Sequence, residues 1–257
     1  MTTRRYLCKQ DKTDEHDYVF GAPRRVLKGL PERRNLWDAS WPAAFDQDEL
    51  GACTANAISM AIWFLMMKQG IPAWLASRLF IYWNERFLEG TWQTDSGASL
   101  RDGMKTICAD GVLPETEYPY DITMFANRPP QLAYAIAQAH QVLMYQRVND
   151  LEQCKGCIAQ GYPFLFGVKV FDSFAEAATR RSGDVPMPKR GWWSGEKTLG
   201  GHAILCTGYD DLTQRFNLLN SYGRGWGKNG TGTIPYAYMA DPELCFDRWT
   251  IRLMEAE

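Results

Sequence analysis

The sequence predicts an α+β protein in which a helical half and a β half meet at a cleft. Residues 54–68 are apolar on every side, which is typical of a helix buried in the middle of a domain. Amphipathic segments at 77–88 and about 99–110 indicate further helices. From residue 162 onward the pattern changes to that of buried strands. We therefore expect one half of the molecule to be helical and the other to be mainly sheet.

The helical half is expected at about residues 45–135. Gly70-Ile71-Pro72 ends the buried helix, and Gly90 ends the second helix. Ser99-Leu100-Arg101-Asp102 offers a capping box for the third. These stop and start signals predict three separate helices rather than one long one.

The β half is expected at about residues 140–254. Asn149-Asp150-Leu151-Glu152 caps a short helix, which ends at Gly161. Asp210-Asp211-Leu212-Thr213 then predicts a turn between two of the strands. The strands themselves are predicted at 163–171, 202–209, 215–220 and about 230–234.

Residues 1–30 are expected to form an extended N-terminal arm in front of a catalytic domain at 31–254. The arm is polar and charged, and we expect Tyr18 and Phe20 to pin it to the body. A disordered tail is the alternative. The arm is too short for a folded inhibitory pro-region, so we expect an enzyme that is active as translated. The arm either docks on the back of the domain or crosses the cleft as a built-in brake.

Composition fits a globular protein with a sizeable core, because 46% of its 257 residues are hydrophobic and 23% are charged. A formal net charge of −2 gives no case for binding nucleic acid or an acidic membrane surface. The N-terminus has no apolar signal-peptide core, and no apolar run approaches the roughly 20 residues that span a bilayer. An odd number of cysteines without framework spacing suits a reducing compartment. We therefore expect a cytoplasmic location.

Cys53 stands at the start of the buried helix, with Gln47 six residues upstream. The N-terminus of a helix carries partial positive charge and N–H groups without helical partners, and both favour a thiolate. The same N–H groups are suited to stabilising an oxyanion. A lone cysteine in an apolar helix is nevertheless more often a small core residue than a nucleophile.

Two distant segments favour the nucleophile. In the first, Gly200-Gly201-His202, a histidine opens a strand after a pair of glycines. The second is Asn220-Ser221-Tyr222-Gly223. Together with Leu50-Gly51-Ala52-Cys53-Thr54, these segments resemble the papain-like cysteine proteases, whose cysteine signature is Cys-Gly-(Ser/Ala)-Cys-(Trp/Tyr). The resemblance covers about residues 30–254 and is greatest to the bacterial branch of that family.

Three positions depart from the family pattern. Leu50 replaces the first cysteine of the signature, so the family's usual disulfide cannot form from this position. Thr54 replaces an aromatic residue. Tyr222 replaces the tryptophan of the family's Asn-Ser-Trp-Gly segment.

The resemblance implies a papain-like fold, with a central buried helix in the helical half and an antiparallel, barrel-like β half. It implies that Cys53 is the nucleophile, that His202 is its base and that Asn220 orients the imidazole. Gln47 and the Cys53 N–H would hold the oxyanion. It also implies that two residues, Gly97 and Tyr222, lie along the substrate cleft, the first bonding the substrate backbone and the second covering the histidine.

The expected activity is that of a cysteine peptidase working through an acyl-enzyme. Two alternatives remain open: a hydrolase or acyltransferase of the same fold that acts on isopeptides or other amides, and an inactive peptide-binding relative. We expect a peptide or protein substrate, no cofactor, no metal, no nucleic acid and no membrane, and the oligomeric state is left open. Cys154-Lys155-Gly156-Cys157 has the spacing of half a metal site, but no second pair accompanies it, so burial in the core is favoured.

Overall fold

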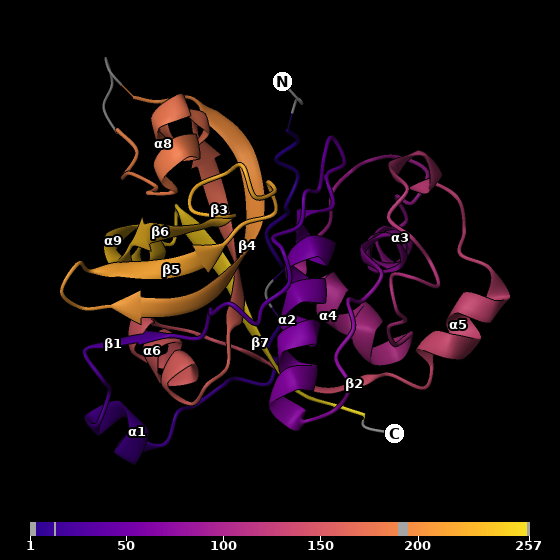
Figure 1. Ribbon diagram of the computed structural model, residues 1–257. Helices are drawn as coiled ribbons and strands as arrows, with labels where there is room; N and C mark the ends of the chain where they lie inside the picture. The colour runs from indigo at the N-terminus through magenta and orange to yellow at the C-terminus, as the bar shows by residue number, and fades with distance from the viewer. Residues whose placement is uncertain (1–3, 13, 190–194, 256–257) are drawn as a thin grey trace.

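The computed structural model describes residues 4–12, 14–189 and 195–255. The long helix at 53–69 stands between the sheet on one side and the helices at 78–88, 100–109 and 131–137 on the other (Figure 1). The helices are α1 (Arg24–Lys28), α2 (Cys53–Gln69), α3 (Arg78–Leu88), α4 (Leu100–Ala109), η1 (Ile122–Met124), α5 (Gln131–Ala137), α6 (Leu151–Ala159), α7 (Asp172–Ala175), α8 (Ala177–Ser182) and α9 (Tyr236–Ala240). The strands are β1 (Arg33–Asn35), β2 (Val142–Arg147), β3 (Phe164–Phe171), β4 (Thr198–Asp210), β5 (Arg215–Leu219), β6 (Thr231–Pro235) and β7 (Cys245–Met254).

The central helix α2 agrees with its prediction to within a residue at each end. It is buried over almost its whole length, because it packs against α3 on one side and against β4 on the other. A helix with two covered faces needs apolar residues all round, which explains its unbroken apolar sequence. Gly70 ends it in the left-handed conformation, with φ of 72°, and its N–H donates to the last carbonyls of the helix.

The next two helices begin at the serines that the sequence indicated. The Ser77 hydroxyl accepts from the Phe80 N–H at 3.2 Å, and that of Ser99 accepts from the Asp102 N–H at 3.2 Å. The second cap differs from a full capping box, because the Asp102 carboxylate binds the Ser99 hydroxyl. The Ser99 N–H donates instead to Glu89 at 2.9 Å.

The sheet has the strand order β2-β7-β3-β4-β5-β6, with β1 paired to β4, and every one of these pairs is antiparallel. In its centre, Val168 of β3 lies opposite His202 of β4. The sheet is open, since the path ends at β2 and β6. The papain-like layout is therefore present, whereas the expected barrel-like closure is not.

Strand β7 was not predicted, although it pairs with both β2 and β3. Asp247 lies in the left-handed region with φ of 49°, and the pairing of β7 with β3 is irregular near this point. Charged residues at Asp247, Arg248 and Arg252 also interrupt its apolar pattern. A bulged strand with charges at these positions lacks the clean alternation that sequence analysis relies on.

The N-terminal arm follows the body of the protein from Arg4 onward and runs between α2 and the sheet (Figure 1). Phe20 is buried, and its N–H donates to the Arg147 carbonyl at 2.8 Å. Tyr18 is 79% exposed, so the expectation that it pins the arm is wrong. Its backbone is used instead, because the Tyr18 carbonyl accepts from the Arg147 N–H at 2.8 Å. Residues 1–3 of the arm lie outside the described ranges.

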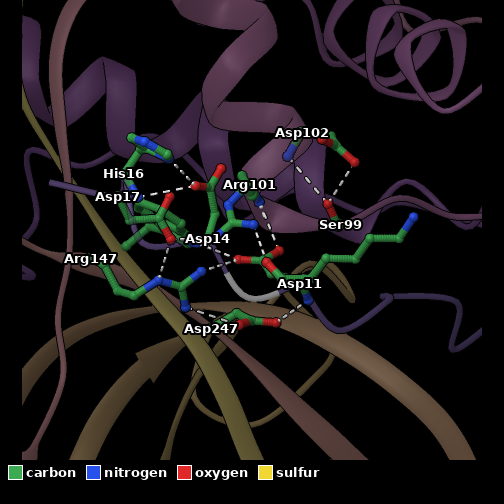
Figure 2. Close-up of polar contacts among 11 residues, drawn as sticks. Asp11, Asp14, His16, Asp17, Ser99, Arg101, Asp102, Arg147 and Asp247 are labelled. Atoms are coloured by element: carbon green, nitrogen blue, oxygen red, sulfur yellow. Dashed lines mark hydrogen bonds and ion pairs between the residues drawn. The ribbon is translucent and has the colours of Figure 1, made fainter. Parts of the chain in front are cut away.

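A cluster of largely shielded charges fixes the arm to the domain (Figure 2). We call it the arm anchor, and it consists of Asp11, Asp17, Arg101, Arg147 and Asp247. Arg147 reaches three carboxylates, those of Asp11 and Asp17 at 2.9 Å each and that of Asp247 at 3.0 Å. The Arg101 guanidinium pairs with Asp17, and the backbone N–H of Arg101 donates to the Asp11 carboxylate at 3.0 Å. Two arginines thus pair with three acids in a place with little solvent, where charges need such partners.

Within the described parts of the chain, no helix is long and apolar enough to cross a membrane. The same residues contain no group of three histidine, cysteine or acidic side chains that could hold a metal ion.

Candidate active site

Cys53 is the first residue of α2 and has no exposed surface. Its own N–H lies in the first turn, where a helix offers no internal acceptor. The loop before it is held by Gly51, whose N–H donates to Asp95 at 3.0 Å. The sulfur therefore lies at the positive end of the central helix, as the sequence predicted.

His202 lies on β4 beside the start of α2, and its ring is fully buried. Its Nε2 is 2.8 Å from Oδ1 of Asn220, a residue that directly follows β5. Among the described residues, no nitrogen or oxygen bonds the other ring nitrogen, Nδ1. The Cys53 sulfur lies next to the ring and interacts with it. The structure thus brings the three distant residues together in the order Cys53, His202, Asn220.

The orientation of the Asn220 amide is fixed by its own neighbour. Its Oδ1 also accepts from the Ser221 N–H at 2.8 Å, which identifies this atom as the acceptor. His202 must then donate from Nε2. This bond leaves Nδ1 facing the sulfur, so the ring is set to exchange a proton there.

Aromatic rings enclose the histidine. Tyr222 stacks on it, with 4.8 Å between ring centroids and 26° between planes. Tyr6 of the arm and Phe174 present their edges at 6.2 Å each. The tyrosine that replaces the family's tryptophan therefore still covers one face of the imidazole, which limits the access of water to the Asn220 bond.

Gln47 is fully buried and held at four points, one of which is its carbonyl, which accepts from the Tyr120 hydroxyl at 2.9 Å. Its Oε1 accepts from the Ser221 hydroxyl at 2.6 Å, its Nε2 donates to the Leu50 carbonyl at 3.0 Å, and its backbone N–H donates to the Ser221 carbonyl at 2.9 Å. The amide has a second Nε2 hydrogen that these bonds do not use. The side chain is thus fixed in place beside the loop that leads to Cys53.

The pKa of Cys53 is held well below that of an ordinary thiol. The first cause is a hydrogen bond from the thiol of Cys8, and the second is the neighbouring His202, while burial acts in the opposite direction. The same contact with Cys53, together with burial, raises the pKa of Cys8 well above its usual value. The proton therefore stays on Cys8, and the negative charge stays on Cys53.

Cys8 belongs to the arm, which crosses the candidate site. The Gly201 N–H donates to the Tyr6 carbonyl at 3.1 Å, and the Cys8 N–H donates to the Gly201 carbonyl at 3.0 Å. On the other rim, the Lys9 N–H donates to the Ala98 carbonyl at 3.0 Å. The arm runs parallel to both rims. Of the two placements considered from the sequence, the arm takes the one across the cleft.

Glycines make this close approach possible. A Cβ on Gly97 would lie 1.9 Å from the Leu7 carbonyl oxygen, and a Cβ on Gly201 would lie 2.1 Å from that of Cys8. Gly97 thus lies against the arm, but its N–H donates to the Tyr82 hydroxyl at 3.1 Å. In this structure the bond to the chain in the cleft is made by the neighbouring Ala98.

Sequence reasoning left open whether the arm crosses the cleft, and no pattern in the sequence singled out Cys8 as part of the site. The only signal was the pair Gly200-Gly201, which looked like a lead into a strand. For Cys154 and Cys157 the expectation holds: both are buried on α6, and burial raises the pKa of both thiols.

Two known proteins are similar to this chain over most of its length. The chain is 40% identical over 241 residues to an uncharacterised peptidase C1-like protein of Acanthamoeba polyphaga mimivirus, covering 89% of this chain and 76% of that protein. The structure of the present chain is similar to that of xylellain, a cysteine protease from Xylella fastidiosa. The TM-score is 0.90, the identity is 33%, and 99% of each chain is covered. The chain belongs to the papain-like cysteine protease family.

More distant papain-like structures share the fold. Digestive procathepsin L2 from Tenebrio molitor larval midgut has a TM-score of 0.73 at 16% identity, covering 97% of this chain and 78% of that one. No family model matches the sequence. The assignment to the papain-like cysteine proteases therefore rests on the two relatives with higher identity, while the more distant structures support the fold alone.

Proposed function

We propose that the protein hydrolyses peptide bonds through a thiolate on Cys53 and an imidazolium on His202. The observation that carries this proposal is the line of contacts from Cys53 at the N-terminus of α2, through the His202 ring, to the Asn220 oxygen at 2.8 Å. A thiolate next to a histidine that a third group orients is the arrangement that nucleophilic acyl transfer needs.

The chemistry proceeds in two halves. The Cys53 sulfur attacks the carbonyl carbon of the scissile bond, and the resulting tetrahedral oxyanion collapses by breaking the C–N bond. The His202 imidazolium gives its proton to the leaving amine. Neutral His202 then takes a proton from water, whose oxygen attacks the thioester, and cleavage of the C–S bond restores the thiolate and the imidazolium.

The proposed oxyanion site combines the Cys53 backbone N–H with the Gln47 side-chain amide. The N–H is at the first position of α2, and the amide keeps one Nε2 hydrogen beyond its bond to Leu50. Removing one donor of this kind typically costs on the order of 10²–10³ in kcat. We propose Gly97 and Tyr222 for the substrate cleft, because the chain that lies there now contacts both.

A peptide or protein is the proposed substrate. The arm, itself an extended peptide, fits the cleft by main-chain hydrogen bonds to Ala98 and Gly201. A hollow of about 290 Å³ is lined by Phe174, Leu199 and Trp226 of the domain, and by Arg4 and Tyr6 of the docked arm. Phe174 also contacts the His202 ring. An extended chain with an apolar side chain matches this surface better than a compact amide would.

We also propose that residues 31–254 form the catalytic unit and that the arm at 1–30 must leave the cleft before a substrate enters. A reducing compartment such as the cytoplasm is the proposed location, because the number of cysteines is odd and all seven are free.

The deciding experiment joins a thiol trap to a peptide-library digest. An epoxide or chloromethyl-ketone trap should label Cys53, and Cys53→Ser should abolish the label while Cys108→Ser, at a half-exposed cysteine outside the site, retains it. Mass spectrometry of the digested library then identifies the bonds that are cut. Label without any cleavage would favour an isopeptide or other amide substrate, whereas no label at Cys53 would favour an inactive binding protein.

A further inference from the structure

The Cys8 thiol meets the Cys53 sulfur inside the cleft. Cys8 is 7% exposed and Cys53 is 0% exposed, and the two side chains interact with each other, while the Cys8 thiol also faces the Lys9 carbonyl at 3.8 Å. Main-chain bonds hold the arm on both sides of this contact, from Cys8 to Gly201 and from Lys9 to Ala98, each at 3.0 Å. Two cysteines far apart in the sequence are therefore placed as a pair by backbone that is itself fixed.

The pair has the chemistry of a redox couple. Cys53 carries the charge and is the sulfur that an oxidant attacks, while Cys8 keeps its proton and stands ready as the second thiol. The four cysteines of the β half differ from Cys53, because burial raises the pKa of each: Cys154, Cys157, Cys206 and Cys245. Among the residues that the structure describes, only Cys53 combines a stabilised thiolate with an interacting second thiol.

We propose that Cys8 is a resolving cysteine, which joins Cys53 in a reversible disulfide under peroxide and so locks the arm in the cleft. This proposal rests on the proposed function, in which Cys53 is the nucleophile. The closed form has lost its nucleophile, and its cleft is filled by a covalently held chain. Reductant returns it to the reduced form by thiol exchange.

The reaction balances in two steps. The Cys53 thiolate attacks one oxygen of hydrogen peroxide, the O–O bond breaks, and with one proton taken up the products are a Cys53 sulfenic acid and one water. The Cys8 sulfur then attacks the sulfenic sulfur, the S–O bond breaks, and the hydroxyl leaves with the Cys8 proton as a second water. Overall, two thiols lose two electrons and one peroxide gains them.

Access for the oxidant does not require unfolding. When residues 4–9 lift from the cleft, Cys53 is open to peroxide, and when they return, Cys8 meets the oxidised sulfur. The return is directed by contacts beyond the pair, since Arg4 binds Asp46 at 3.1 Å and the arm anchor holds Asp11. The arm thus delivers the second thiol to the place where the sulfenic acid forms.

The proposal implies that Cys8 protects the enzyme. A sulfenic acid that finds no thiol is oxidised further to sulfinic and sulfonic acids, which ordinary reductants do not reverse. With Cys8 present, oxidation stops at the disulfide. Removing Cys8 should therefore turn a reversible inactivation into a permanent one.

The test compares wild type, Cys8→Ser and the control Cys108→Ser, each fully reduced first and assayed on the peptide library. Each protein is treated with hydrogen peroxide, alkylated and digested without reductant. In wild type and Cys108→Ser we expect a peptide that links Cys8 to Cys53, and an activity that returns with dithiothreitol. In Cys8→Ser we expect Cys53 as sulfinic or sulfonic acid and a recovery lower by at least about tenfold.

Two results would overturn the proposed Cys8–Cys53 disulfide lock without affecting the proposed peptidase function. One is an active reduced enzyme that forms no linked peptide after peroxide, or forms a link at Cys154 and Cys157 instead. The other is a Cys8→Ser variant that recovers as fully as wild type. A reduced wild type that cleaves nothing in the library would instead overturn the proposed function, and the lock with it.

Discussion

His202 donates from Nε2 to the Asn220 side-chain oxygen at 2.8 Å, and the two residues are 0% and 3% exposed. A hydrogen bond so well shielded by protein cannot be replaced by water when one partner is removed. Its loss therefore leaves a buried donor without an acceptor, and the ring loses the contact that sets its orientation.

Replacing Asn220 with alanine should slow the enzyme without stopping it. An unsatisfied buried donor costs about 1–3 kcal/mol, which corresponds to a drop of about 5- to 150-fold in kcat/KM. Steady-state kinetics on the best library peptide provide the measurement. Asn217→Ala on β5 is the control and should behave as wild type. Equal kinetics for both variants would show that Asn220 does not orient the ring.

Cys53→Ala and His202→Ala should each remove essentially all turnover, because each breaks the pair that makes the nucleophile. Circular dichroism and thermal unfolding should show that the fold is kept, and Cys53→Ser serves as a second variant of similar volume. Residual peptidase activity above about a tenth of wild type in Cys53→Ala would contradict the assignment.

The pH dependence of kcat/KM should be bell-shaped. The acid limb reports formation of the Cys53 thiolate and should lie well below the ordinary cysteine value of about 8.5, since the Cys8 and His202 contacts lower the Cys53 pKa. The alkaline limb reports loss of the imidazolium proton. A single rise near the ordinary thiol value would remove the ion pair from the mechanism.

Weakening the docked arm should raise the initial rate. Arg4 binds Asp46 at 3.1 Å and the Asp48 carbonyl at 3.0 Å, and it lies 5.0 Å from the centre of the Tyr222 ring. Because the site is partly exposed, these contacts contribute up to about 1 kcal/mol, so Arg4→Ala should speed cleavage by up to about fivefold. The control is Arg24→Ala, at an exposed arginine of α1. A slower Arg4→Ala enzyme would mean that the arm supports catalysis.

Acid should stabilise the docked arm through Asp11. Burial, and then the neighbouring Asp247, raise the pKa of Asp11 to about 6, against the opposing effect of Arg147. The folded state therefore holds this proton more tightly than the unfolded state. Its contribution is present below about pH 4 and is lost as the pH rises through about 6.

Between pH 7 and pH 5, wild type should gain about 1 kcal/mol of unfolding free energy relative to Asp11→Asn, which carries no titrating group there. Urea unfolding of both proteins at the two pH values measures this difference. Because the other groups of the arm anchor are the same in both proteins, the comparison isolates Asp11. If the unfolding free energies of wild type and Asp11→Asn change equally between pH 7 and pH 5, Asp11 does not cause the pH dependence.

The parts of the fold that sequence analysis predicted well are those set by local signals. Ser77, Ser99 and Asp150 cap helices through bonds to residues three positions on, so start signals and structure agree. The unbroken apolar sequence of α2 likewise reflects its burial on both sides, so the helix could be predicted from the sequence. Strand β7 was not predicted, because its bulge at Asp247 depends on pairing partners elsewhere in the chain.

The candidate site likewise has a part that local sequence patterns predict and a part that they do not. Cys53, His202 and Asn220 stand in segments whose glycines and neighbours form recognisable patterns. The path of the arm depends on contacts between residues 4–12 and positions from 46 to 249, and no local pattern predicts those. Gly97 and Gly201 were visible in the sequence, but only the structure shows which chain approaches them.

The arm contacts both rims of the cleft through main-chain atoms at Ala98 and Gly201. It is thus a tethered competitor whose effective concentration is set by the length of its own chain. The arm leaves the same fraction of molecules open for every substrate, so each apparent KM rises by one common factor. The arm can therefore scale the overall rate of proteolysis while leaving the ratio of kcat/KM values, and hence the choice among substrates, to the residues of the cleft.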